Sequence, residues 1–310
     1  MIRIKEYLLV AFKGMCMGAA DVIPGVSGGT IAFLMGIYSR LIGAINSINK
    51  DNLKLLFRFR IKDFFTAIDG AFLCSLFAGI LISFFSLAKL MTYLLEYHPI
   101  PLWSFFFGLI LASIIIIIKD LDGFKLRNIL SFIAGTAIAS YICLVSPSET
   151  SEAYWFIFVS GAIAICAMIL PGISGSFILL LLGKYRFLMD AVANLNIPVL
   201  IVFFIGAVLG ILAFSRFLGW LLKRWYMPTI ALLSGFMLGS LIKVWPWKAK
   251  VANAIVSAAG DKAPSVDYPI LPSQYREMTG NPDLLGSALL FAVIGIAIVI
   301  VIELAAKRKK

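Results

Sequence analysis

Charged side chains are scarce in this sequence. Only 14% of its 310 residues are Asp, Glu, Lys or Arg, whereas soluble domains carry about 25%. Hydrophobic residues make up 61% of the chain, and a soluble globule of that composition would expose large apolar patches to water. The shortage of charge therefore excludes a soluble domain and a disordered chain, and it indicates a polytopic membrane protein.

Residues that bind metals are equally few. The one histidine, His98, lies in a short Tyr97-His98-Pro99 connection, and the four cysteines lie in apolar runs without metal-ligand spacing. Cysteine in such a run behaves as a small buried hydrophobe. We therefore predict no disulfide framework, no bound metal and no cofactor.

The net charge of +11 comes from basic residues that cluster at the ends of apolar runs. A basic soluble protein would suggest nucleic-acid binding, but Lys and Arg beside membrane spans mark the cytoplasmic side. The partner indicated by this distribution is the bilayer, and nucleic acid is not expected.

Six uncharged apolar runs are each about as long as a span. A hydrocarbon core of about 30 Å takes about 20 apolar residues in a helix. The runs cover residues 70–88, 99–118, 128–148, 199–215, 225–242 and 284–302. The fold class expected is an all-α polytopic membrane protein.

Two further apolar stretches, 22–39 and 153–183, contain Pro24-Gly25-Val26-Ser27-Gly28-Gly29-Thr30 and Pro171-Gly172-Ile173-Ser174-Gly175-Ser176. Proline and clustered glycines break a helix. Backbone freed in this way must be buried in protein or line a wet cavity, because lipid cannot satisfy it. Each stretch therefore predicts a re-entrant hairpin of two half-helices, covering 8–45 and 154–193.

The two hairpins belong to an internal repeat. At an offset of 147 residues Pro24 aligns with Pro171 and Ser27 with Ser174; at an offset of 127, Gly79 aligns with Gly206. The 20-residue difference matches a basic stretch, 46–66, which reads as an insertion in the first half. We predict two repeats, 1–148 and 149–310, each a hairpin followed by three spans.

Loop charges fix the expected orientation. The N-terminal flank, the insertion 46–66, the pair Lys223-Arg224 and the tail are basic, whereas the loop 146–152 has no Lys or Arg. Both termini are therefore expected in the cytoplasm, with the loop 247–283 outside. A hairpin plus three spans crosses an odd number of times, so the repeats are inverted. Inverted repeats with broken helices are the architecture of secondary transporters.

The broken segments have the chemistry of an anion site. A serine can cap the following half-helix, glycines let a ligand approach the backbone, and the helix N-terminus supplies N–H donors and a positive dipole end. Close helix packing is the alternative reason for the glycines. The residues predicted to bind a substrate phosphate here are Ser27, Gly28, Gly29, Thr30, Ser174, Gly175 and Ser176.

Charged residues inside apolar runs are functional candidates. Asp21 lies three residues before Pro24, and its repeat partner is Met168, so one hairpin alone carries a carboxylate. Asp21 is therefore a candidate site for a coupling proton or sodium ion; a structural, hydrogen-bonded carboxylate is the alternative.

Four basic residues could carry a phosphate between the leaflets. Arg40 and Arg186 flank the distal ends of the hairpins, and Lys89 and Arg216 share one repeat position. For such long side chains the alternative is that they extend to the membrane surface without touching substrate.

The first motif, Gly14 to Thr30 (GMCMGAADVIPGVSGGT) followed by Gly36-Ile37-Tyr38, resembles the signature of the PopT-type polyprenyl-phosphate transporters. The second motif, Pro171 to Ser176 followed by Gly183-Lys184-Tyr185, is similar too, and the resemblance runs from about residue 8 to 303. It implies a transporter of the bacterial cytoplasmic membrane that returns undecaprenyl phosphate from the outer to the cytoplasmic leaflet, with no catalytic residues.

Two other functions compete with this interpretation. Membrane undecaprenyl-pyrophosphate phosphatases also have inverted repeats and a Pro-Gly-x-Ser motif, in which an arginine follows the serine and glutamates serve catalysis. Here Gly28 and Gly175 hold the arginine position, and the apolar runs contain no glutamate. A small-anion transporter would also suit Asp21 and the two loops. The sequence does not indicate an oligomeric state.

Overall fold

The structure is a computed structural model that describes residues 2–21, 27–119, 125–145, 150–251 and 266–307. Nearly all of this chain is helical. The helices in chain order are α1 (Ile2–Asp21), α2 (Gly28–Leu34), α3 (Tyr38–Asn46), α4 (Lys50–Phe57), α5 (Ile61–Ala67), α6 (Gly70–Tyr97), α7 (Pro99–Lys119), α8 (Leu126–Leu144), α9 (Tyr154–Ile169), α10 (Gly175–Leu181), α11 (Tyr185–Ala193), α12 (Ile197–Arg224), α13 (Tyr226–Val244), α14 (Pro272–Thr279) and α15 (Leu285–Lys307).

Five of the described helices, α6, α7, α8, α12 and α13, are long and apolar enough to cross a membrane. The bent pair α2–α3 raises this number to six if it counts as one span, and α9 and α15 contain shorter apolar segments. The expectation of an all-helical membrane protein with several spans is therefore confirmed. All six uncharged runs predicted from the sequence became helices, although α15 contains too short a described apolar segment to count among the five.

Each predicted hairpin contains one helix more than expected. The sequence indicated two half-helices joined at the Pro-Gly motif, but α2 and α3 are separate helices bent by 113°. Gly36 has φ +69° at this corner, and Gly183 has φ +64° at the corresponding corner between α10 and α11. Glycine adopts positive φ without the steric cost that a Cβ brings, which explains a second break that the proline motif alone did not indicate.

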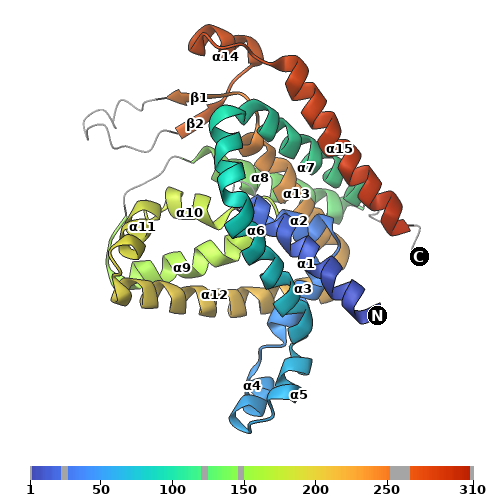
Figure 1. Cartoon of the computed structure of the whole chain (residues 1–310), viewed down its shortest axis with the longest axis vertical. Helices are drawn as coiled ribbons and strands as arrows, with labels where there is room; N and C mark the ends of the chain where they lie inside the picture. The colour runs from blue at the N-terminus through green and yellow to red at the C-terminus, as the bar shows by residue number, and fades with distance from the viewer. Residues whose placement is uncertain (1, 22–26, 120–124, 146–149, 252–265, 308–310) are drawn as a thin grey trace.

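The two halves of the chain have matching helix bounds and matching packing partners. The bounds of α2 and α3 recur 147 residues later in α10 and α11, and those of α6 recur 127 residues later in α12. Within the first half α1 packs on α6, and within the second half α9 packs on α12. Between the halves, α7 packs on α15, and α13, the counterpart of α7, packs on α8. Figure 1 shows α9, α10 and α11 on one side of α6 and α7 and α15 on the other, while α12 runs from the first group across the lower part of α6 toward α3.

Glycine contacts reproduce this correspondence at atomic level. A Cβ added at Gly14 would lie against the carbonyl oxygen of Leu76, and one added at Gly161 would lie against that of Phe203. Both residues of the second pair follow those of the first at the predicted offsets. The pairs Gly79–Ala11 and Gly206–Phe158 correspond in the same way. In the pairs Gly108–Ala292 and Gly235–Phe132 only the glycines are related by a predicted offset, and each glycine meets a helix of the other half. Small residues let membrane helices approach closely, so the same close crossings are built twice.

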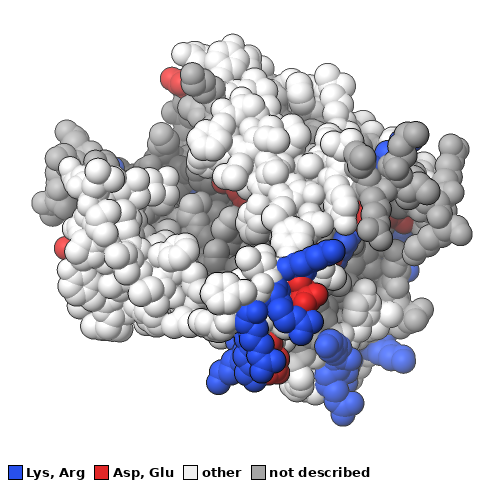
Figure 2. All heavy atoms as spheres, turned by 60° about the horizontal axis from the view of Figure 1, so that its bottom comes forward, with Lys and Arg blue, Asp and Glu red and all other residues white. Residues whose placement is uncertain are grey.

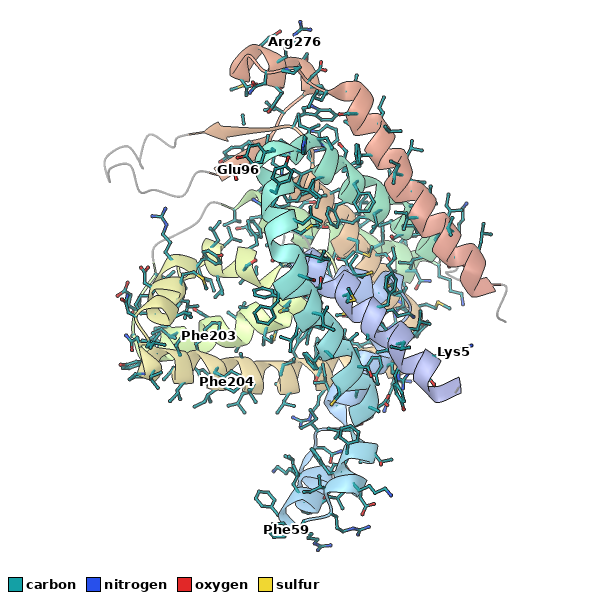
Figure 3. All side chains as sticks on the ribbon, in the orientation of Figure 1. Lys5, Phe59, Glu96, Phe203, Phe204 and Arg276 are labelled. Carbon is teal, nitrogen blue, oxygen red and sulfur yellow. The ribbon has the colours of Figure 1, made fainter. Side chains whose placement is uncertain are left out.

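The basic insertion at 46–66 forms two short helices, α4 and α5. The sequence suggested a polar loop, but Asn49 caps α4 by accepting hydrogen bonds from the N–H groups of Asp51 (3.1 Å) and Asn52 (2.9 Å). These helices project from the body beside the beginning of α6, with Phe59 near the tip (Figures 1 and 3). Lys and Arg side chains gather on the face that this end presents (Figure 2).

The predicted loop 247–283 contains regular structure that an all-α expectation missed. Strands β1 (Lys248–Val251) and β2 (Val266–Pro269) pair antiparallel with Lys248 opposite Pro269, and α14 follows. Two indole N–H groups attach this segment to the bundle. Trp245 Nε1 donates to the carbonyl of Ile270 and Trp247 Nε1 to that of Asp283, both at 2.8 Å.

Candidate functional site

The two broken segments meet inside the protein. Ser27 precedes α2 and is buried, and its Oγ accepts a hydrogen bond from the N–H of Gly29 at 3.1 Å. The same oxygen lies 3.3 Å from the carbonyl of Met168 and 3.2 Å from that of Leu170, at the end of α9. A hydroxyl has one proton, so Ser27 caps its own helix and donates to one of two carbonyls of the other half.

Thr30 forms a second link between the segments. Its Oγ1 accepts the N–H of Gly172 at 2.8 Å, and both groups are buried. Gly172 itself has φ +92°, and a Cβ there would meet the carbonyl oxygen of Phe236 on α13 at 2.6 Å. The Pro171-Gly172 turn therefore has room only for a glycine. Residues 22–26, with the predicted Pro24-Gly25, lie outside the described residues.

Asp21 contacts the site directly. Its Oδ1 accepts the N–H of Gly28, the first residue of α2, at 2.7 Å. A carboxylate at a helix N-terminus satisfies an otherwise unpaired donor and interacts favourably with the dipole. From the sequence we predicted that the N–H of Gly28 binds the substrate and that Asp21 binds a coupling ion. In this structure the two groups are hydrogen-bonded to each other.

The second segment has a different hydrogen-bond pattern. Ser174 precedes α10 but its side chain makes no capping hydrogen bond; instead its Oγ lies 2.8 Å from Ser176 Oγ. Ser174 is buried, whereas Gly175 and Ser176 are partly exposed. With Met168 in the position of Asp21, no carboxylate from α9 lies at the start of α10. The two predicted half-sites are therefore chemically unequal.

The three predicted basic residues whose side chains are described, Arg40, Arg186 and Arg216, are not gathered at these loops. Arg40 binds Asp69 (Nε–Oδ2 2.7 Å) and Glu6 (3.2 Å) and lies over the ring of Phe72, so it stabilises the start of α6. Arg216 donates to the carbonyl of Ile48 at 3.1 Å, beyond the end of α3. Arg186 is exposed on α11. Lys89 belongs to α6, and its side chain lies outside the described residues.

Three polar contacts at the helix corners were not anticipated. Lys13 Nζ donates to the carbonyl of Met35 at 2.7 Å, between α2 and α3. At the corresponding corner of the second half, the hydroxyl of Thr150 donates to the carbonyl of Leu182. Lys184 is buried and donates to the carbonyl of Thr150 at 2.7 Å. A lysine inside an apolar run was the only sequence signal for this arrangement.

A large apolar groove adjoins the first segment. Its volume is about 1060 Å3, slightly above the range of about 300–1,000 Å3 that is typical of ligand pockets. It lies between α1, α2, α6, α7 and α15. Its lining includes Ala19, Ala20 and Ile31 beside the loop, and His98 and Ser287 near the far ends of the helices. Nearly all of its lining is hydrocarbon, which suits a long apolar chain better than a hydrated ion.

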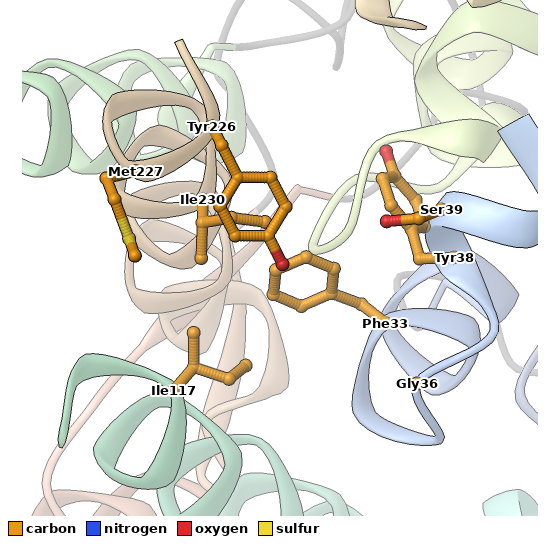
Figure 4. A pocket seen from close by; sticks show the side chains of 8 residues that line it. All are labelled: Phe33, Gly36, Tyr38, Ser39, Ile117, Tyr226, Met227 and Ile230. Carbon is orange, nitrogen blue, oxygen red and sulfur yellow. The ribbon is translucent and has the colours of Figure 1, made fainter. Parts of the chain in front are cut away.

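A smaller pocket of about 230 Å3 lies where α2 and α3 meet the start of α13 (Figure 4). Tyr226 extends toward the corner that Phe33 and Tyr38 form, and Ile117 of α7 closes one side. The Tyr38 hydroxyl is buried and makes no hydrogen bond to any described residue.

The site brings hydroxyl groups and backbone N–H donors together beside one carboxylate, and in this structure the N–H groups of Gly28, Gly29 and Gly172 are hydrogen-bonded within the site. Such donors can hold an anion by hydrogen bonds, and a carboxylate can take up a proton or coordinate a metal cation. Within the described ranges, no three His, Cys, Asp or Glu side chains form a group that could hold a metal ion.

Comparisons with known proteins agree with one another. Residues 17–262 match the family model described as undecaprenyl phosphate translocase-like. A polyprenyl-phosphate transporter of Vibrio cholerae serotype O1 is 44% identical over 298 residues, which are 96% of each chain. Another, of Staphylococcus aureus, is 34% identical over 252 residues, which cover 76% of this chain and 84% of that protein. No solved structure gives a significant match. The chain is thus a multi-pass membrane protein that belongs to the undecaprenyl phosphate translocase-like family.

Proposed function

We propose that this protein transports polyprenyl phosphate across the bacterial cytoplasmic membrane, from the outer to the cytoplasmic leaflet. The two relatives named polyprenyl-phosphate transporters support the substrate class. The observation that carries the proposal is the apolar groove whose inner end is formed by Ala19, Ala20 and Ile31, next to Asp21 and the Ser27–Thr30 segment. One molecule with a polar head and a long apolar tail fits both features at once.

The groove holds the polyprenyl tail. Its lining from α1, α6, α7 and α15 is apolar. Inside a bilayer there is no water to exclude, so the hydrophobic effect does not stabilise a closed groove. A groove of this size therefore has to be filled by packing against another apolar chain. A flexible isoprenoid meets that need without displacing any helix.

The phosphate is held where the two broken segments meet. The hydroxyl groups of Ser27 and Thr30 and the N–H groups of Gly28 and Gly29 lie on one side, and Ser174, Gly175 and Ser176 on the other. Hydrogen-bond donors and helix dipoles can hold an anion without a fixed buried cation. Arg216, Arg186 and Lys89 supply positive charge nearer the two membrane surfaces. The structural role of Arg40 with Asp69 and Glu6 argues against placing it on the route.

Asp21 couples transport to a proton or sodium ion. In this structure its carboxylate takes the N–H of Gly28 that the phosphate would need. Neutralising the carboxylate would weaken that contact and reduce repulsion of the incoming phosphate. Cation binding at Asp21 and phosphate binding at α2 would then favour each other, as coupled transport requires.

The two halves are inverted repeats. Matching helix bounds and matching glycine contacts support two copies of one unit. The basic termini and the basic helices α4 and α5 support a cytoplasmic location for both ends and for the insertion. An inverted pair places the substrate site at the interface of the repeats, which is where Ser27 and Thr30 contact residues 168–172.

The protein moves its substrate without changing it. Cleaving a phosphoanhydride requires a cation to stabilise developing charge and a base to activate a nucleophile. Gly28 and Gly175 lie where the phosphatase motif has arginine, and Asp21 is engaged with the backbone.

A binding experiment separates a lipid carrier from a small-anion carrier. The purified protein in nanodiscs should bind polyprenyl phosphate, and excess inorganic phosphate should not displace it. Ala19→Trp fills the groove and should abolish lipid binding, whereas Ile201→Trp on the exposed face of α12 should not. Binding of inorganic phosphate alone, unaffected by Ala19→Trp, would favour the small-anion alternative.

A further inference from the structure

One face of α3 is fully covered by the other half of the molecule. Ile42 is 1% exposed and Ile45 8% exposed, and α3 packs on α12. At the centre of this contact a Cβ on Gly219 would meet the side-chain nitrogen of Asn46, and Ile42 at 3.6 Å. Arg216 adds its hydrogen bond to the carbonyl of Ile48.

The corresponding face of α11 is uncovered. Met189 occupies the position of Ile42 in the repeat and is 47% exposed, and Val192 occupies that of Ile45 and is 53% exposed. Helix α11 packs on α10 and α12 of its own half. On α6, Met91 and Leu95 correspond to Leu218 and Leu222; both are partly exposed, whereas Leu218 and Leu222 are buried.

We propose that the exposed face of α11 is a docking surface for the Met91–Leu95 face of α6 in the same chain. Docking of α11 on α6 would alternate with docking of α3 on α12. The inference rests on the proposed transport function, because a carrier needs two states of similar free energy. Two copies of one packing unit, used in turn, supply such states.

Residue sizes support this second interface. The α3–α12 contact pairs a large residue, Asn46, with a small one, Gly219. The corresponding pair is Ala193 and Thr92, in which the small residue is on the short helix and the larger on the long one. A small residue therefore again faces a larger one, with the sides exchanged, and the second pair is larger than the first by about one methyl group. In the repeat alignment Lys89 takes the position of Arg216 and Leu195 that of Ile48.

The sides of the membrane follow from the basic segments. The end of α3 leads into the basic helices α4 and α5, and α12 ends at Lys223 and Arg224, so the closed contact faces the cytoplasm. The uncovered faces of α11 and α6 lie toward the other surface. This structure is therefore the outward-facing state, in which the apolar groove can receive a lipid from the outer leaflet.

Paired cysteines test the exchange, in a background where the four native cysteines are replaced by serine. Asn46→Cys with Gly219→Cys should form a disulfide across the observed contact. Thr92→Cys with Ala193→Cys should form one across the proposed contact. The control pair, Thr92→Cys with Phe204→Cys, joins α6 to an exposed position on α12 and should remain reduced (Figure 3). Either disulfide should stop polyprenyl phosphate transport, and reduction should restore it.

Thiol labelling of single cysteines gives a readout that does not need a disulfide. Val192→Cys should react quickly with maleimide and Ile45→Cys slowly, and added polyprenyl phosphate should bring the two rates closer. The proposal is overturned if the Thr92/Ala193 pair crosslinks no faster than the control pair, or if transport continues with the Asn46/Gly219 pair crosslinked. Crosslinking at both contacts without polyprenyl phosphate transport would refute the proposed function while leaving the docking intact.

Discussion

The carboxylate of Asp21 accepts the backbone N–H of Gly28 at 2.7 Å, so the last residue of α1 satisfies the first donor of α2 across the break between them. A Cβ added to Gly28 would collide with that carboxylate. Glycine at 28 and aspartate at 21 are therefore interdependent, and Met168, at the position of Asp21 in the second half, makes no such contact possible there.

Replacing Asp21 by asparagine should abolish ion-driven transport and leave the fold intact. The amide oxygen can still accept the N–H of Gly28, but the uncharged side chain can no longer bind and release a proton or a sodium ion. The measurement is uptake of polyprenyl phosphate into vesicles with and without an imposed proton or sodium gradient. If Asp21→Asn transports at the wild-type rate under the gradient, Asp21 has a structural role and does not bind the coupling ion.

Replacing Thr30 by valine should destabilise the contact between the two halves. The buried N–H of Gly172 would lose its acceptor, and an unsatisfied buried donor costs about 1–3 kcal/mol. Thr30→Ser keeps the hydroxyl and is the matched control. Thermal unfolding in detergent should show a clear loss of melting temperature for Thr30→Val and a smaller one for Thr30→Ser; equal losses would mean that the hydrogen bond contributes little.

Gly14→Leu and Gly161→Leu should destabilise the protein to a similar extent. Each new side chain would meet a backbone carbonyl of the facing helix, Leu76 or Phe203, and overpacking costs about 1–3 kcal/mol. Gly43→Leu, at a helical position with open space around it, should be tolerated. A large effect at only one of the two glycines would mean that the two crossings are not mechanically equivalent.

Much of the fold could be predicted because apolar length and helix breakers are local properties. The uncharged runs became α6, α7, α8, α12, α13 and α15, and the Pro171-Gly172 motif separates α9 from α10. Pro24-Gly25 lies outside the described residues. The corners at Gly36 and Gly183 were missed because a single glycine in an apolar run does not distinguish a positive φ from close packing. The helices α4 and α5 were missed because their charge suggested a loop, although Asn49 offered a capping residue.

The site was predicted less completely than the fold. Sequence symmetry indicated that Ser27 and Ser174 would have the same role, but Ser27 caps α2 while Ser174 pairs with Ser176. Which carbonyl or carboxylate reaches a hydroxyl depends on how the halves pack, and the repeat pattern does not contain that information. We predicted that Arg40 binds phosphate because it lies at the distal end of the first hairpin. In the structure it forms salt bridges with Glu6 and Asp69, which are distant from it in sequence.

Cysteines placed at exposed positions should report the orientation of the chain. Phe57→Cys in α4, 84% exposed, should react with an impermeant maleimide only from the cytoplasmic side, and Met278→Cys in α14, 63% exposed, only from outside. In intact cells the reagent reaches only the outer side of the membrane, and in inside-out vesicles it reaches only the cytoplasmic side. Labelling of both positions from the same side would contradict the inverted arrangement.

The most direct test of transport uses proteoliposomes loaded with polyprenyl phosphate in one leaflet and an impermeant head-group reagent outside. The reconstituted protein should move the lipid between leaflets well above the rate of protein-free vesicles, and Gly175→Leu, whose side chain would meet the carbonyl of Ala164, should stop it. Polyprenyl pyrophosphate supplied in parallel should release no phosphate. Movement no faster than in protein-free vesicles, transport indifferent to Gly175→Leu, or sustained phosphate release would each contradict a polyprenyl-phosphate transporter.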